Sequence, residues 1–278
     1  MTQYENEVKK RDVMCCMNAG NQGCGRKWSR MRIITDTGTD ILDIEAKKLG
    51  IELVAIRSNF TDTVFSENTE AEFTRFYDKL RQTDTLPVSS QPSPAEFLEL
   101  FEDAKEKQEE VVVITISSKL SGTYNGAMLA KDMAEYDNIY VVDSLLASLS
   151  ERLLVEYAVK LRDAGMGAKE LVRKLEQDRE RVILTGVPST LLYLKMGGRI
   201  SPVVAAVGGV IGIKPVLWLK DGVIESRSKA RGMRMAKSGM QSFLKDYEAD
   251  PAMPVMFAHS DNAEMGQQFM EETVQQFG

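Results

Sequence analysis

The sequence predicts an α/β protein with two domains, and two observations lead to that prediction. From Met31 onward, short apolar runs alternate with amphipathic segments, a rhythm typical of βαβ units around a mainly parallel sheet. After about residue 150 the pattern changes, and two apolar runs flank Asp221-Gly222 as in a β-hairpin. We therefore expect an N-terminal α/β domain over 31–150 and a second α+β domain with antiparallel strands over 151–278.

Helix caps and apolar runs define the elements of the first domain. Ile33 and Ile34 open a strand that ends in the turn 35–40, and a short helix then runs to Lys48 with Gly50 as its stop. The later elements are predicted as a strand at 52–56, a helix at 69–81 capped by Thr69, a helix from Pro94 to about Lys107 capped by Ser93, a buried strand at 111–116, a helix from about Ser121 and a buried strand at 139–142.

The second domain is predicted from the same signals. Its elements are helices at about 150–164 and 168–180, a strand at 182–187, a short helix before Gly197, the hairpin at 215–224, a helix near 232–246, a strand near 254–258 and a helix near 262–276. The run 203–213 is apolar on every side, so it predicts a buried core helix or a lining for an apolar tail. It is too short for a membrane span, which needs about 20 residues.

Charge and cysteine content exclude several classes of protein. The chain has 35 basic and 41 acidic side chains, a net charge of −6, so it lacks the basic footprint of a nucleic-acid-binding protein. Residues 1–30 hold all three cysteines and have no apolar periodicity, so we expect a disordered extension. These cysteines lack paired CxxC spacing and a nearby histidine, which argues against a metal site. They favour a reducing, cytoplasmic compartment, and no signal peptide precedes them.

Polar clusters follow the predicted strands, where ligands of parallel sheets usually bind. They lie at 35–40, 89–93, 117–123 and 143–144. Ser89 and Ser90 are free to bind an anion at a helix N-terminus, whereas Ser93 has plain helix capping as its alternative. Ser118 and Ser121 repeat this arrangement, again with capping as the alternative, and Gly122 permits the close approach of a ligand.

Two further features have a structural and a functional interpretation. Gly197-Gly198 is either a helix C-cap or a device that presents Arg199 to an anionic ligand or a partner. His259 is the only histidine, and the sequence has neither a nucleophile elbow nor a P-loop. We therefore assign no catalytic residue and no metal ligand.

Seven motifs occur in one order, and together they resemble the DegV family. They are TDTGTD (35–40), SSQPSPAEF (89–97), ISSKLSGTYNGA (116–127), VVDS (141–144), YLKMGGRIS (193–201), IKPVLWLKDGVIE (213–225) and AHSD (258–261). The members of that family are cytoplasmic bacterial fatty-acid-binding proteins, and several are the lipid-carrying subunit of fatty acid kinase. The resemblance covers residues 31–278.

The resemblance implies a lipid carrier that is not itself an enzyme and needs no cofactor. It implies one long-chain fatty acid, with its tail in an apolar tunnel between the domains and its carboxylate at the SSQPS turn. Chemistry would take place on the ATP-binding subunit of the kinase, with no nucleic acid and no integral membrane segment involved. The residues implied for the carboxylate end are Ser90, Ser89, Ser93, Asn59, Ser118, Ser121 and Gly122, and the residue implied to engage the kinase is Arg199.

The sequence departs from the family pattern in ways that keep two alternatives open. The family continues into a further strand and a GTHxGPG-like turn that this sequence does not contain, so we expect either a fragment or an altered head-group site. The glycine-rich stretch after the DS motif reads Leu149-Ser150-Glu151-Arg152 here, and Val88 replaces a threonine. The alternatives are an enzyme acting on a small anion, as a hydrolase or phosphotransferase, and a non-functional or regulatory fragment.

Overall fold

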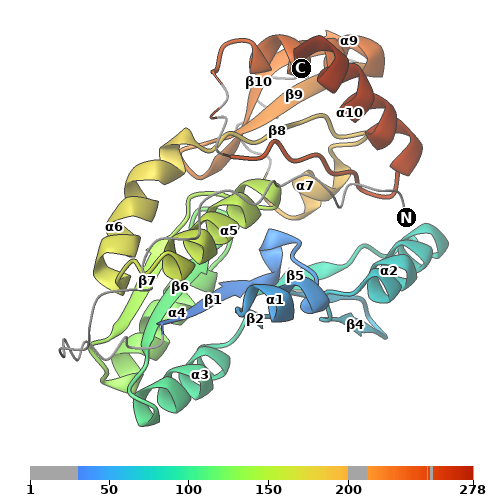
Figure 1. The fold of residues 1–278 in the computed structure, drawn as a ribbon. Coiled ribbons are helices and arrows are strands. Elements are labelled where there is room, and N and C mark those ends of the chain that lie inside the picture. The colour runs from blue at the N-terminus through green and yellow to red at the C-terminus, as the bar shows by residue number, and fades with distance from the viewer. Residues whose placement is uncertain (1–30, 200–211, 249, 251–252, 278) are drawn as a thin grey trace.

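The computed structural model describes residues 31–199, 212–248, 250 and 253–277, and its elements form two lobes (Figure 1). The strands are β1 (Met31–Asp36), β2 (Glu52–Val54), β3 (Arg57–Asn59), β4 (Val64–Phe65), β5 (Val88–Ser90), β6 (Glu110–Thr115), β7 (Ile139–Asp143), β8 (Thr185–Gly186), β9 (Ile213–Lys220) and β10 (Val223–Arg231). The helices are α1 (Asp43–Leu49), α2 (Glu70–Gln82), α3 (Pro94–Glu106), α4 (Thr123–Ala134), α5 (Leu149–Asp163), α6 (Ala168–Asp178), α7 (Leu192–Met196), α9 (Gly232–Leu244) and α10 (Ala263–Phe277), with 3₁₀ turns at Thr37–Thr39 (η1) and Arg179–Arg181 (η2). We call β1–α6 the first lobe and β8–α10 the second lobe.

A four-stranded parallel sheet with the order β2-β1-β6-β7 forms the centre of the first lobe. Its strands are buried because helices cover both faces, which explains the uninterrupted apolar run of β6. Alternate residues of β6 point to opposite faces: Val111 and Val113 pack with Phe97 of α3, whereas Val112 packs with Leu154 of α5. The predicted α/β fold class is confirmed.

Helices α5 and α6 follow the predicted domain boundary at residue 150, yet they pack on the parallel sheet. Leu154 and Leu171 are fully buried in the same core as Ile33 of β1. The change in sequence pattern near residue 150 therefore does not coincide with the point where the chain passes from the first lobe to the second. The domain boundaries themselves stay a prediction.

A three-stranded antiparallel sheet with the order β4-β3-β5 is the main feature that the sequence did not predict. The predicted strand at 52–56 ends at Val54, and β3 follows it directly. These strands have two or three residues and are mostly polar, so they show none of the apolar periodicity on which a strand prediction depends. The strand β5 carries Ser89 and Ser90.

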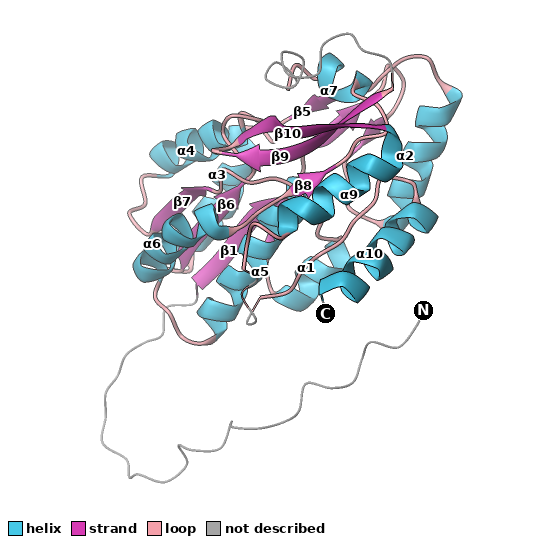
Figure 2. Ribbon diagram, turned by 90° about the horizontal axis from the view of Figure 1, so that it is seen from above, coloured by secondary structure: helices cyan, strands magenta, loops and turns pink. Residues whose placement is uncertain are grey.

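The second lobe contains the predicted hairpin in a three-stranded antiparallel sheet with the order β10-β9-β8. Helix α9 lies along this sheet (Figure 2). On the face that it covers, Trp218 meets Phe243 edge to face at 5.5 Å. The predicted strand near 254–258 is wrong, because the described residues 253–262 form an irregular segment. Pro254 in this segment has no N–H to donate, and no described strand pairs with it.

Two predictions fall wholly or largely outside the described residues. These are the disordered extension at 1–30 and the apolar run at 203–213, of which only residues 212 and 213 are described. Within the described part of the chain, no helix has both the length and the apolar character to cross a membrane.

Candidate functional site

The ends of β1, β6 and β7 form one polar edge of the parallel sheet, as predicted for the clusters 35–40, 117–123 and 143–144. The fourth predicted cluster, 89–93, lies instead at the end of β5 in the small antiparallel sheet. Two aspartates fix the turns of the polar edge. Asp36 at the end of β1 accepts hydrogen bonds from the backbone N–H groups of Gly38 at 2.9 Å and Ile116 at 2.8 Å. Asp143 at the end of β7 accepts them from Ser118 at 3.0 Å and Leu145 at 3.1 Å. Each carboxylate thus ties the backbone after its own strand to a neighbouring turn.

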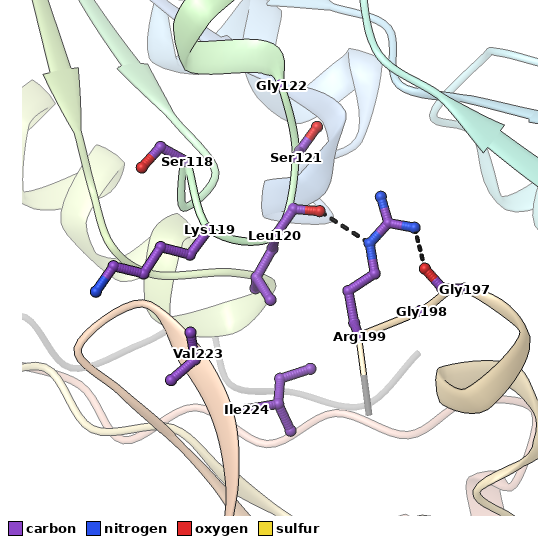
Figure 3. A pocket seen from close by; sticks show the side chains of 10 residues that line it. All are labelled: Ser118, Lys119, Leu120, Ser121, Gly122, Gly197, Gly198, Arg199, Val223 and Ile224. Carbon is purple, nitrogen blue, oxygen red and sulfur yellow. Dashed lines mark hydrogen bonds between the residues drawn. The ribbon is translucent and has the colours of Figure 1, made fainter. Parts of the chain in front are cut away.

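A cleft of about 390 Å³ lies between this edge and the second lobe (Figure 3). It is lined by Ser118, Lys119, Leu120, Ser121, Gly122, Gly197, Gly198, Arg199, Val223 and Ile224. Arg199 is exposed, and its Nε donates to the backbone carbonyl of Leu120 at 3.0 Å. Its guanidinium also donates to the carbonyl of Gly197. Four of the predicted site residues, Ser118, Ser121, Gly122 and Arg199, therefore line one cleft.

Asn59 and Ser90 form a second polar group on the small antiparallel sheet. Pairing of β3 with β5 places Asn59 opposite Val88, next to Ser90. The Asn59 side-chain amide donates to Ser90 Oγ at 3.0 Å and to the Val88 carbonyl at 2.9 Å. Ser89 and Ser90 are exposed, and neither lines the cleft.

Gln91 connects these two groups. Its Nε2 donates to the carbonyl of Gly122 at 3.2 Å, so the SSQPS turn and the SSKLSG turn touch. A Cβ on Gly122 would lie only 1.9 Å from Gln91 Oε1, so any larger residue at this position would displace the Gln91 amide. Sequence reasoning missed Gln91 because it weighed the hydroxyl groups of the motif and not its amide.

Ser93 is engaged at the start of α3. Its backbone N–H and its hydroxyl both donate to Glu96 Oε2 at 2.9 Å, in line with the capping alternative. Arg57 binds the same carboxylate at 2.5 Å. The Arg57 guanidinium, with further help from Ser93, lowers the pKa of Glu96 to about 2.

The hairpin turn of the second lobe is anchored on the first lobe. Ser117 Oγ, which is buried, donates to the carbonyl of Gly222 at 2.7 Å. Gly222 has φ +80°, and a Cβ there would lie 2.6 Å from Ser117 Oγ and 3.0 Å from Leu145. Only glycine satisfies both requirements. The sequence predicted this turn from Asp221-Gly222 but did not predict its hydrogen bond with Ser117.

His259 has a local structural role. Its Nδ1 accepts a hydrogen bond from the backbone N–H of Asn262 at 3.2 Å, just before α10, and its ring packs against Gly266. No serine hydroxyl is hydrogen-bonded to this histidine within the described residues. In the same part of the chain, no cluster of three or more His, Cys, Asp or Glu side chains is arranged to hold a metal ion.

Comparison with known proteins places this chain in a family. A family model described as "Uncharacterised protein, DegV family" matches residues 30–278. The chain belongs to the DegV family. A DegV domain-containing protein from Caldanaerobacter subterraneus subsp. tengcongensis is 31% identical over 236 residues, which cover 84% of each chain.

Solved DegV structures resemble this chain over most of its length. One is described as fatty acid binding of a DegV family protein from Thermus thermophilus; it has a TM-score of 0.71 and 31% identity and covers 78% of this chain and 77% of that one. Another is the Fatty Acid Kinase (Fak) B3 protein of Streptococcus pneumoniae loaded with linoleic acid, with a TM-score of 0.74, 27% identity and 89% coverage of both chains. The family resemblance seen in the motifs is thus confirmed.

Proposed function

We propose that this DegV chain binds one long-chain fatty acid and presents its carboxylate to an ATP-dependent kinase subunit, which phosphorylates it to an acyl phosphate. The tail would lie between the lobes and the carboxylate at the SSQPS turn. Binding and phosphorylation of the fatty acid would take place in the bacterial cytoplasm, and this chain would supply no catalytic group.

The likeness to DegV structures with bound fatty acid carries this proposal, because it extends over most of both chains. The geometry agrees with it. The exposed hydroxyls of Ser89 and Ser90 and the half-buried hydroxyl of Ser121 are neutral hydrogen-bonding groups in the two turns that the Gln91–Gly122 contact joins, and the Asn59 amide orients Ser90 Oγ. Such groups hold a carboxylate without the cost of a buried counter-charge.

The energetics of this assignment are adequate. Burying a 16-carbon tail at about 0.8 kcal/mol per CH₂ contributes on the order of 12 kcal/mol, before the cost of association is subtracted. The head group then needs only a few donors, each contributing about 1.5–3 kcal/mol to a charged partner. Arg199 is exposed beside the cleft, and we propose that it contacts the kinase subunit.

Native mass spectrometry of the purified chain, followed by organic extraction, tests the carrier function directly. We expect a bound mass equal to one fatty acid. The head-group assignment is tested by measuring palmitate affinity in Ser89→Ala/Ser90→Ala and in Asn59→Ala, with Ser242→Ala on the exposed face of α9 as the control.

We expect each site variant to lose about tenfold in affinity, the equivalent of one charge-assisted hydrogen bond. Unchanged affinity in the double serine variant would reject the head-group site. An empty, folded protein that also fails to take up palmitate would reject the carrier function in favour of the fragment alternative. Ester hydrolysis that depends on His259 would instead favour the enzyme alternative.

A further inference from the structure

Two buried carboxyl groups, Asp36 and Glu151, lie beneath the polar edge that carries the cleft. Both residues are 0% exposed. A Cβ built on Gly38 would lie 2.7 Å from Asp36 Oδ1 and 3.4 Å from Glu151 Oε2, so the two groups border the same glycine. Glu151 is in the first turn of α5, in the stretch where the motif resemblance leads us to expect glycine.

Glu151 is surrounded by acidic groups and has no cationic partner among the described residues. Asp36 faces it from β1, Asp40 from the turn after η1 and Asp143 from β7. Arg152 on the same helix pairs with Glu45 and Glu156, each at 2.8 Å. Arg179 donates through Nη1 to the backbone carbonyl of Asp143 at 2.5 Å, and its buried Nε has no hydrogen-bond partner among the described residues.

Neither carboxyl oxygen of Glu151 makes a hydrogen bond of ordinary geometry in the described part of the chain. The Thr35 hydroxyl favours the charged form of Glu151, but burial and the acidic neighbours outweigh it and raise the pKa of Glu151 well above its ordinary value. Asp36, by contrast, accepts two backbone N–H bonds, which favour its charged form. Between these two groups, the negative charge belongs on Asp36 and the proton on Glu151.

The acid pair underlies the backbone that joins the two lobes. Asp36 holds Ile116, and Ser117 follows with its hydroxyl on Gly222. The carbonyl of Gly38 accepts from the N–H of Ser148 at 2.8 Å, which fixes the loop 144–148. Leu145 of that loop packs against the hairpin turn. A second negative charge beside Asp36 would repel it and draw water towards these same turns.

Backbone strain makes this junction sensitive. Leu145 and Ser148 have φ +54° and +52°, values that disfavour residues with a side chain. Such conformations persist only where the surrounding contacts over-determine them. Repulsion between Asp36 and an ionised Glu151 would therefore disturb the loop 144–148, which is already strained.

We propose that Glu151 carries a proton at neutral pH and acts as a positioning residue, holding the turn 116–122 and the loop 144–148 in the arrangement that binds ligand. Loss of that proton lowers ligand affinity. The affinity part of this inference rests on the proposed fatty acid binding, whereas the protonation and the loop ordering do not.

The protonation state is tested on the full chain by carboxyl ¹³C NMR with labelled glutamate, with Glu151→Gln used to assign the signal. We expect Glu151 to keep its proton well above the pH at which an exposed glutamate ionises. A midpoint near that of an exposed glutamate, about 4.3, would overturn the proposal. So would a rise in melting temperature on adding Na⁺, K⁺ or Mg²⁺ that Glu151→Gln abolishes, because a cation would then neutralise the site.

The positioning role is tested by palmitate affinity and amide hydrogen exchange at pH 6 and pH 8.5. Glu176→Gln, on the exposed side of α6, is the matched control. Between pH 6 and pH 8.5, we expect the palmitate affinity of the unmodified chain and of the control to fall by about fivefold or more. We also expect the amides of the loop 144–148 to exchange faster at pH 8.5, after correction for intrinsic exchange rates. Glu151→Gln, which mimics the protonated acid, should respond clearly less in both respects, with only the ionisation of Asp36 remaining.

An equal response of the unmodified chain and Glu151→Gln would overturn the positioning role. If no palmitate binds at either pH, the proposed function fails, and the exchange of the loop 144–148 alone decides this inference. If Glu151→Gln does not fold, the carboxyl signal of Glu151 is assigned in the unmodified chain through its connection to the backbone resonances, and its midpoint decides the inference.

Discussion

At the scale of single residues, the site depends on close contacts that leave no room for a side chain. Gly38, Gly122 and Gly222 each have a polar side-chain atom within 2.7 Å of the position that a Cβ would occupy. Gly122 lines the cleft, Gly222 lies at the junction of the lobes, and Gly38 lies over the buried carboxyl groups of Asp36 and Glu151. Close contacts thus account for these glycines, and at Gly222 the φ of +80° adds a second requirement for glycine.

Replacing Gly122 with alanine should disturb the contact between the two serine turns. The new Cβ would overlap the Gln91 amide, which must move and give up its hydrogen bond to Gly122. We expect a loss of about 1 kcal/mol in the free energy of unfolding, measured by urea denaturation. In a Gln91→Ala background the same substitution should cost little, and equal costs in both backgrounds would contradict this account.

The acid pair predicts how stability depends on pH. Burial raises the pKa of Asp36 from 3.8 to about 7 and that of Glu151 well above its ordinary value, so the folded chain binds these protons more tightly than the unfolded chain does. The contribution of Asp36 to stability is complete below about pH 4 and is lost as the pH rises through about 7; that of Glu151 has the same sign and is likewise lost as the pH rises.

Glu151→Gln should remove part of this dependence. We expect the variant to exceed the unmodified chain by about 1 kcal/mol or more in the free energy of unfolding at pH 8, and by little at pH 5, as measured by urea denaturation. A variant that is less stable than the unmodified chain at pH 8 would contradict the account, because a charged, hydrogen-bonded Glu151 would then have been stabilising.

At the scale of elements, the start of α3 organises the SSQPS turn. Pro94 occupies its first helical position, and Ser93 with Glu96 closes the N-terminus. Arg57 of β3 binds the same carboxylate, so the cap also joins the helix to the small antiparallel sheet. One glutamate thereby holds β3, β5 and α3 in a fixed relation around Ser90.

Glu96→Gln should destabilise the chain in a way that depends on pH. The pKa of Glu96 is lowered from 4.5 to about 2, first by the Arg57 guanidinium, so its contribution is present above pH 4.5 and is lost as the pH falls towards 2. Because the pair is about a third exposed, we expect only about 1 kcal/mol at pH 7, measured by thermal denaturation. A difference between the variant and the unmodified chain that does not shrink between pH 5 and pH 3 would contradict this.

At the scale of the whole molecule, contacts join the lobes at separate places. The Ser117–Gly222 hydrogen bond is buried, and Arg199 reaches Leu120 beside the cleft. Arg81 at the end of α2 forms an ion pair with Asp261 before α10. Apolar packing joins the lobes as well, because Leu219 of β9 belongs to the buried core of the first lobe and Ile224 of β10 packs against that core. Figure 1 shows the two lobes side by side.

Gly222→Ala should weaken this junction while leaving the parallel sheet folded. The substitution combines a strained φ of +80° with a contact of 2.6 Å to Ser117 Oγ. We expect a loss of about 2–3 kcal/mol in stability, with faster amide exchange in the hairpin and the loop 144–148. Gly167→Ala is the matched control, since its Cβ would meet no atom within 4 Å. Equal effects of the two substitutions would show that the junction does not depend on this contact.

Much of the fold could be predicted from the sequence because it depends on local signals. The apolar run of β6, the cap at Ser93 and the stop at Gly50 each lie within a few residues of the element that they define. The turn at Asp221-Gly222 likewise predicted the hairpin. The strand predicted at 254–258 failed because apolar residues form a strand only where a partner strand accepts their backbone hydrogen bonds.

The sequence by itself therefore determined the α/β class, the polar edge of the sheet and, through its motifs, the DegV family. Only the tertiary structure decided which groups meet: Gln91 with Gly122, Ser117 with Gly222, and Glu151 with Asp36. The physical reason is the range of the interactions. Caps and periodicity act between neighbours in the chain, whereas contacts between turns and the ionisation of a buried carboxyl depend on residues brought together from distant segments.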